Sequence, residues 1–160
     1  MKISLSLFTA MLLLASITLG GGAPGAPEDP QVIAIKNLVE EYARCCRQED
    51  LAALARIYAK GPDTVQISAV GAVVTGWKAI EDGFRNFFQN VDGCKMQFAI
   101  HAIKILADGK AACLTAEQEA TMRVNNREVT FQDVRMTWFL EKQDGHWRIV
   151  NAHWSIAQRP

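Results

Sequence analysis

The feature that most constrains the fold is an Asp-Gly pair, Asp144-Gly145, between two alternating segments near the C-terminal end. The flanking segments, residues 129–143 and 146–155, are rich in β-branched and aromatic side chains, which is typical of a β-hairpin with a two-residue turn. Successive strand residues point to opposite faces, so one face of this hairpin would be apolar. That face carries Val134, Met136, Trp138, Leu140, Val150, Ala152 and Trp154. We expect it to line a pocket that the rest of the chain covers.

Two further long strands are expected upstream of this hairpin, over residues 95–106 and 110–125, joined by a turn at Asp108-Gly109. Most of their even-numbered side chains are apolar and would face the same side as the apolar wall of the hairpin. These side chains are Met96, Phe98, Ile100, Ala102, Ala112, Leu114, Ala116, Ala120 and Met122. The four long strands then form an antiparallel meander, which buries one face by packing helices on it.

Three amphipathic helices precede the meander. Apolar residues recur at helical spacing over 31–48 and 51–59, and Asp50 is placed to cap the second helix. A third helix is expected after Gly76-Trp77, and two short strands, 64–68 and 72–75, are expected around Gly71. The order of elements predicts an α+β fold. It would be a cone made of a strongly curved, mostly antiparallel sheet, with the three helices of the N-terminal half on its concave face.

The first residues differ in kind from the rest of the chain. Lys2 is followed by an uncharged, mostly apolar run over 3–19 and then by small residues up to Ala23. This pattern predicts a signal peptide at 1–23, a flexible leader at 24–30, a single folded domain at 31–158 and an exported mature protein. The alternative is a membrane anchor, but the run is marginal for a spanning helix, which needs about 20 apolar residues. Pro24 and Pro27 leave the cleavage site open.

Charge and cysteine content exclude several classes of partner. The 17 basic and 17 acidic residues balance, and no Lys/Arg run exists that would neutralise phosphates, so we expect no nucleic-acid partner and no membrane surface after signal cleavage. The four cysteines contain no Cys-x-x-Cys spacing, so neither a metal nor another cofactor is expected. Export would permit disulfides, although small buried thiols are the simpler interpretation.

Three stretches carry a resemblance to a known superfamily. They are Tyr42 followed by residues 49–54, residues 76–80 followed by Phe84 and Phe87, and residues 144–150 running into 153–155. Together they resemble the nuclear transport factor 2-like superfamily, in its SnoaL-like and ketosteroid-isomerase-like branch. The last stretch is also similar to the association domain of calcium/calmodulin-dependent kinase II. The resemblance implies an apolar cavity on the concave side, frequent dimerisation through the outer side of the sheet, and Tyr42 and Trp154 at the pocket.

The candidate ligand pocket combines this resemblance with strand alternation. It comprises Tyr42, Gln66, Phe98, Gln118, Met136, Trp138, Val150, Ala152 and Trp154. In the isomerases the tyrosine at the place of Tyr42 donates a hydrogen bond to a developing oxyanion. The alternative is a core tyrosine whose hydroxyl finds an internal partner.

A catalytic carboxylate is harder to place. The isomerases need an acidic residue after the second helix, where this sequence has Gln66 and no acid. Val129 and Phe131 are odd-numbered whereas Val134 is even-numbered, so the alternation slips near Asp133 and predicts a β-bulge. Such a bulge could turn Asp133 inward, where it would form a minimal acid/base pair with Tyr42. Otherwise Asp133 is solvated or paired at the surface.

The opposite face of the sheet is expected to be an interface. His153 shares it with Arg135, and we interpret His153 as part of a polar outer face, with a base or a metal ligand as the alternative. Apolar residues near the strand ends would also point outward and form a patch that a homodimer covers. They are Ile103, Ile105, Phe139, Trp147 and Ile149.

Three functions remain open from the sequence. The first is binding of a small apolar or amphipathic molecule without a clear catalytic apparatus. The second is an isomerase- or cyclase-type enzyme that uses Tyr42 and Asp133. The third is a module that mainly oligomerises.

Overall fold

The structure is a computed structural model that describes residues 27–69 and 71–156. The predicted signal peptide, residues 24–26 of the leader and the last two residues of the predicted domain lie outside this range. The described residues form the helices α1 (Pro30–Gln48), α2 (Leu51–Ile57) and α3 (Trp77–Asn90), a 3-10 turn (Ala107–Gly109), and the strands β1 (Val65–Ile67), β2 (Val73–Thr75), β3 (Val91–Leu106), β4 (Ala111–Val124), β5 (Arg127–Gln143) and β6 (His146–Ile156). This element order matches the sequence prediction.

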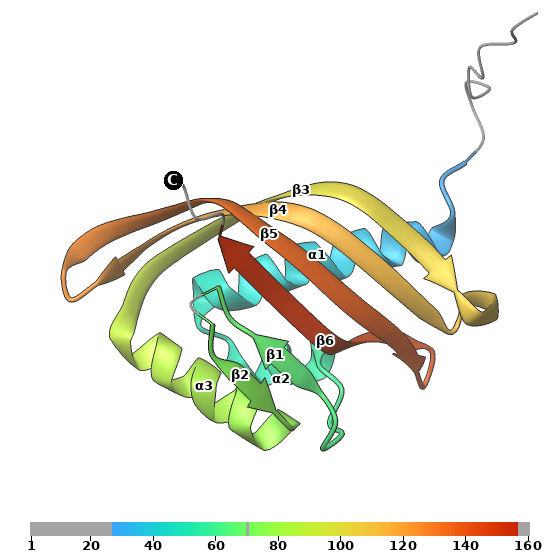
Figure 1. The fold of residues 1–160 in the computed structure, drawn as a ribbon, viewed down its shortest axis with the longest axis horizontal. Coiled ribbons are helices and arrows are strands. Elements are labelled where there is room, and N and C mark those ends of the chain that lie inside the picture. Colours follow the sequence, from blue (N-terminus) through green and yellow to red (C-terminus); the bar gives the residue numbers. More distant parts are fainter. Residues whose placement is uncertain (1–26, 70, 157–160) are drawn as a thin grey trace, which may run out of the picture.

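The strands form one sheet in the order β2-β1-β6-β5-β4-β3. Neighbouring strands are antiparallel except for β1 and β6, which run parallel. The long strands bend across α1, while α3 and the short strands lie below them (Figure 1). The predicted α+β cone with helices on the concave side of a curved, unclosed sheet is therefore confirmed.

The starts of α1 and α2 are set by side chains that cap the free backbone N–H groups of the first turn. The Asp29 carboxylate accepts a hydrogen bond from the backbone N–H of Gln31 at 2.8 Å, and Pro30 occupies the first turn of α1. The predicted cap of α2 is confirmed, because Asp50 Oδ1 accepts from the backbone N–H of Ala53 at 2.8 Å. The helix ends at Ile57, two residues before the predicted end.

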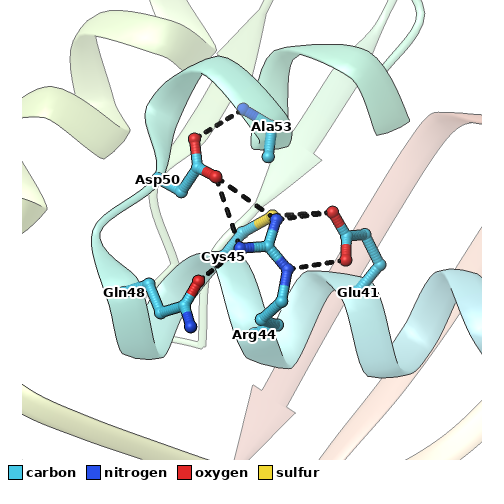
Figure 2. Close-up of polar contacts among 6 residues, drawn as sticks. All are labelled: Glu41, Arg44, Cys45, Gln48, Asp50 and Ala53. Carbon is cyan, nitrogen blue, oxygen red and sulfur yellow. Dashed lines mark hydrogen bonds and ion pairs between the residues drawn. The ribbon is translucent and has the colours of Figure 1, made fainter.

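The α1–α2 corner is held by Arg44 (Figure 2). Its guanidinium donates to both carboxylate oxygens of Glu41, at 2.7 and 2.6 Å, and to Asp50 Oδ2 at 3.3 Å. It also donates to Gln48 Oε1. One arginine thus links the last turns of α1 to the residue that caps α2, and this sets the direction in which the second helix leaves the first.

The C-terminal hairpin forms as predicted. Asp144 and Gly145 have φ values of 51° and 77°, and two consecutive positive φ angles are what a tight hairpin turn between right-twisted strands requires. The buried side chains of β5 alternate as expected from Val134 to Leu140. The predicted bulge is also confirmed, because the β4–β5 register shifts between Gln118 and Ala120, opposite Asp133, whose φ is 55°.

Three other register shifts were not predicted, and two of them correct the assignment of faces. An extra residue at His101 shifts the β3–β4 register, so Ala102 pairs with Thr115 on the outer face, while Ile103 and Ile105 pack against the core. An extra residue at Val150 shifts the β5–β6 register in the same way. Beyond it Trp147 and Ile149 are buried, at 6% and 0% exposure. Of the five side chains expected in the outer apolar patch, only Phe139 is exposed, at 48%.

The cysteines agree with the simpler interpretation. Cys45, Cys46 and Cys94 are buried and Cys113 is half-buried, and all four are free thiols.

Within residues 27–69 and 71–156, no group of His, Cys, Asp or Glu side chains is arranged to hold a metal ion. None of the described helices has the length and apolar character that crossing a membrane would take.

Candidate functional site

A cavity of about 530 Å³ lies between α3, the β1–β2 segment and the inner face of β3 to β6. Phe84 and Phe87 contribute to its wall from α3, and Met96, Phe131 and Val134 contribute from the long strands. These residues are positioned by the amphipathic face of α3 and by the confirmed bulge in β5, which lets Phe131 and Val134 share the inner face. The result is a mostly apolar hollow with a few polar side chains, as is usual for small-molecule sites.

Four predicted pocket residues line this cavity: Tyr42, Gln66, Gln118 and Trp154. The others do not. Met136, Trp138 and Ala152 are buried in the packed core, and Val150 is the half-buried extra residue of the β6 bulge. Phe98 lines a second, smaller hollow of about 280 Å³.

Ring packing explains why the middle of the cone is not hollow. The Tyr42 ring lies at the centre of a cluster, with ring centroids 5.1 Å from Trp138, 6.0 Å from Trp154 and 6.2 Å from Phe98. Phe84 packs edge-on against the same tyrosine at 6.3 Å. Aromatic pairs prefer such edge-on or offset arrangements. Together these rings fill the space between α1 and the middle of the sheet. The open volume is displaced toward the β4–β5 turn, a part of the sheet that alternation alone did not single out.

Two glutamines of the cavity wall accept hydrogen bonds from aromatic side chains. Gln118 Oε1 accepts a hydrogen bond from the indole Nε1 of Trp154 at 2.8 Å, and the two side chains are buried to the same degree, each 7% exposed. Gln66 Oε1 accepts from the Tyr58 hydroxyl at 3.0 Å. Farther out, Asn86 and Asn90 line the cavity from α3, and Asn90 Nδ2 donates to the Asn86 backbone carbonyl at 2.7 Å.

Titratable groups at the cavity are neutral near pH 7. Burial raises the pKa of Tyr42 well above its ordinary value, and the nearby Cys46 thiol raises it further. Burial likewise raises the pKa of Cys46. Among the described residues that line the cavity, none is Asp, Glu, His, Lys or Arg. The wall therefore offers hydrogen bonds and apolar surface, with no fixed charge to compensate an ion.

The structure does not bring Asp133 to Tyr42. Although the bulge exists, Asp133 is exposed and lines the smaller hollow together with Gln97, Glu117 and Glu119. The physical reason is that the extra residue is accommodated on the outer face, while Phe131 and Val134 keep the inner positions. The structure therefore places Tyr42 and Asp133 in the walls of two different hollows.

His101 and His153 lie on the outer face, as alternation predicts. His153 is exposed and pairs across the sheet with Thr137. His101 Nε2 lies 3.5 Å from Glu117 Oε1, and both side chains are 55% exposed. Neither histidine belongs to the cavity wall in the described part of the chain.

Sequence reasoning missed several wall residues. The helical spacing of Phe84 and Phe87 and the odd-numbered phase of Phe131 each predict an apolar face, yet neither pattern shows which part of the interior stays open. Met96 and Met122 complete that end of the cavity. The position of the cavity is decided by the packed aromatic cluster around Tyr42, which fills the rest of the interior.

Comparisons with known proteins agree with this architecture. A ketosteroid isomerase-like protein from Erwinia carotovora atroseptica has a TM-score of 0.69 and 15% identity, covering 82% of this chain and 99% of that one. A protein from Xanthomonas campestris, assigned as a calcium/calmodulin-dependent protein kinase II association domain, has a TM-score of 0.70 and 24% identity, covering 85% and 94%. A protein from Novosphingobium aromaticivorans, assigned as a scytalone dehydratase, has a TM-score of 0.72 and 15% identity, covering 80% and 85%.

At these identities the likeness shows the nuclear transport factor 2-like fold and not a function. No curated protein matches the chain. The sequence profile of the SnoaL-like domain matches residues 35–159, which is most of the chain. The chain therefore belongs to the SnoaL-like domain family.

Proposed function

We propose that this protein binds a small, largely apolar molecule in the cavity beneath its sheet. The observation that carries the proposal is the cavity itself, which measures about 530 Å³ and has an apolar wall with a few polar groups. Pockets for small ligands typically span about 300–1,000 Å³ and have this composition. A site of this kind binds by burying apolar ligand surface, and its polar groups orient the ligand.

The geometry supports binding rather than acid/base catalysis by the predicted pair. Tyr42 lines the cavity, but Asp133 is exposed and lines the smaller hollow. A general base must reach the proton that it abstracts, within about 3 Å or through one water. Asp133 is not among the residues that line the cavity, which favours binding over catalysis by this pair.

Native mass spectrometry of the freshly purified protein tests the proposal. We expect a small molecule to co-purify with the wild type and to be lost in Ala120→Phe, because Ala120 is a buried wall residue and the new ring would occupy the cavity. Ala79→Phe, at an exposed position of α3, is the matched control and should retain it. A bound molecule that survives in a folded Ala120→Phe protein would contradict the assignment. So would the absence of any bound molecule together with failure to bind planar apolar probes.

We also propose that the mature protein is exported and pairs with a second copy through the outer face of its sheet. The export proposal rests on the N-terminal pattern at residues 1–23, and N-terminal sequencing of the protein made by its host should find a chain that starts near Pro24.

The proposed pairing of two copies rests on Phe139, a large exposed ring on a face that also carries both acidic and basic side chains, Glu117 and Arg135 among them. A two-fold partner can cover the ring and place opposite charges together.

A further inference from the structure

We propose that Gln118 and Gln66 select uncharged ligands that carry a hydrogen-bond acceptor, such as a ring ketone, and that Trp154 fixes this preference. The inference rests on the proposed binding function and names the chemical class of its ligand. It follows from the direction of two hydrogen bonds at the cavity wall and from the absence of charged side chains among its described lining residues.

The orientation of the Gln118 carboxamide is determined by its partner. A tryptophan indole N–H only donates, so the atom that faces it at 2.8 Å must be the oxygen of Gln118. The amide nitrogen, with two donors, is then the group that Gln118 can offer. No partner for this nitrogen is found among the described residues, and it is not one of the fully enclosed unpaired atoms, so it borders one of the hollows that Gln118 lines.

Gln66 repeats the arrangement from the opposite side of the cavity. The Tyr58 hydroxyl donates to Gln66 Oε1 at 3.0 Å. Burial raises the pKa of Tyr58 well above its ordinary value, so the hydroxyl keeps its proton and remains a donor. In Gln66, as in Gln118, the oxygen already accepts one hydrogen bond, and the NH₂ group has no partner among the described residues. Both amide groups belong to side chains that line the cavity, and donors at its wall match a ligand that presents an acceptor.

The charge of the ligand follows from the same wall. A buried anion is costly unless it is paired, and the described lining residues include no Lys, Arg or His. A carboxylate ligand would therefore rely on amide donors alone, whereas a ketone loses much less hydration on entry. Phe84, Phe87, Phe131 and Trp154 supply flat surfaces for a planar ring system.

An isosteric series of tricyclic probes tests each step. Fluorenone carries an acceptor, fluorene carries neither donor nor acceptor, carbazole carries a donor, and fluorene-2-carboxylate carries a charge. We expect fluorenone to bind about tenfold more tightly than fluorene, which is the usual value of one net hydrogen bond. Carbazole and the carboxylate should bind more weakly than fluorenone. Quenching of tryptophan fluorescence or calorimetry would give the four affinities.

Two variants assign the preference to these residues. In Gln118→Leu, fluorenone should fall to within about threefold of fluorene, whose own affinity changes little because it uses no donor. Gln97→Leu, an exposed glutamine of the neighbouring strand β3, is the matched control and should keep the full ratio. In Trp154→Phe the indole donor is lost and the Gln118 carboxamide can rotate. Carbazole should then gain about three- to tenfold relative to fluorene.

The outcomes separate the two proposals. Equal binding of fluorenone, fluorene and carbazole would overturn the selectivity while leaving the binding function in place. A preference for the carboxylate would overturn the inferred neutrality of the ligand. If carbazole does not gain in Trp154→Phe, the fixing role of Trp154 is wrong. Failure of the wild type to bind any of the four probes would overturn the binding function for planar ring compounds and the inference with it.

Discussion

Trp154 Nε1 donates to Gln118 Oε1 at 2.8 Å across strand β5, so two buried polar side chains from β6 and β4 satisfy each other at the cavity wall. The contact links β6, near the middle of the sheet, to β4 beside the edge strand, and both side chains also line the cavity. Under the proposed selectivity, stability and ligand preference depend on the same hydrogen bond.

Removing the acceptor should destabilise the fold. In Gln118→Leu the indole N–H of Trp154 keeps its buried position but loses its partner, which typically costs about 1–3 kcal/mol in the free energy of unfolding. Urea unfolding at pH 7 measures the loss, and Gln97→Leu at an exposed site should change the free energy by less than about 0.5 kcal/mol.

A double-mutant cycle shows whether the hydrogen bond is the cause. Adding Trp154→Phe to Gln118→Leu removes the unsatisfied donor, so the double variant should lose less stability than the two single losses added together. Strictly additive losses would mean that Gln118 and Trp154 stabilise the protein independently, and the hydrogen bond would then carry no coupling.

The bulge in β5 should be sensitive to β-branched side chains. Asp133 adopts a φ of 55°, a left-handed conformation that Asp and Asn tolerate but that crowds a branched Cβ. We expect Asp133→Val to lose about 1–2 kcal/mol of unfolding free energy relative to Asp133→Asn. Urea unfolding of the two variants checks this, and equal stabilities would show that the bulge relaxes without strain. Asp133→Asn should also bind cavity ligands as the wild type does, since residue 133 lines the other hollow.

Local signals in the sequence determined the elements correctly. Asp50 was placed as a helix cap, Asp144-Gly145 as a hairpin turn and Asp133 as a bulge, and all three are confirmed. Each of these features has a chemical signature within a few residues. The bulge at Asp133 was visible because apolar side chains change from odd to even positions across polar Gln132 and Asp133.

The bulges at His101 and Val150 leave no such signature. Ile149 and Val150 are neighbours and both apolar, so the sequence fits either phase of alternation equally well. Ala102 and Ile103 have the same ambiguity after His101. The tertiary core decides between the phases by burying Ile149 and Ile103, and the position of the cavity depends likewise on how large rings pack.

The Arg44 cluster predicts an acid-sensitive contribution to stability. Hydrogen bonds from Arg44 lower the pKa of Glu41, and the backbone N–H of Ala53, followed by Arg44, lowers the pKa of Asp50. A carboxyl whose pKa is depressed in the folded state stabilises the fold above its unfolded pKa and loses that contribution as the pH falls through the folded pKa. Arg44→Met should therefore lower the urea midpoint at pH 7 and have a smaller effect at pH 3.

Arg47→Met provides the control for that experiment, because Arg47 is an exposed arginine one residue before the end of the same helix. Its substitution should shift the midpoint little at either pH. The same loss at pH 7 and pH 3 for Arg44→Met would show that the arginine acts through packing of its aliphatic stem, and the ionic interpretation would be wrong.

The outer face offers the last prediction. Phe139 is 48% exposed and lies between Cys113 of β4 and Asn151 of β6, so in a two-fold dimer it would be covered by the partner sheet. Phe139→Glu removes the apolar contact and adds a charge that must be desolvated in the interface, and both changes favour the monomer. Val73→Glu is the matched control, since Val73 is 65% exposed on strand β2, far along the sheet from Phe139 in strand order. Sedimentation velocity at low micromolar concentration should show a dimer for the wild type and Val73→Glu and a monomer for Phe139→Glu. A wild-type monomer, or a dimer that survives Phe139→Glu, would place any interface elsewhere on the molecule.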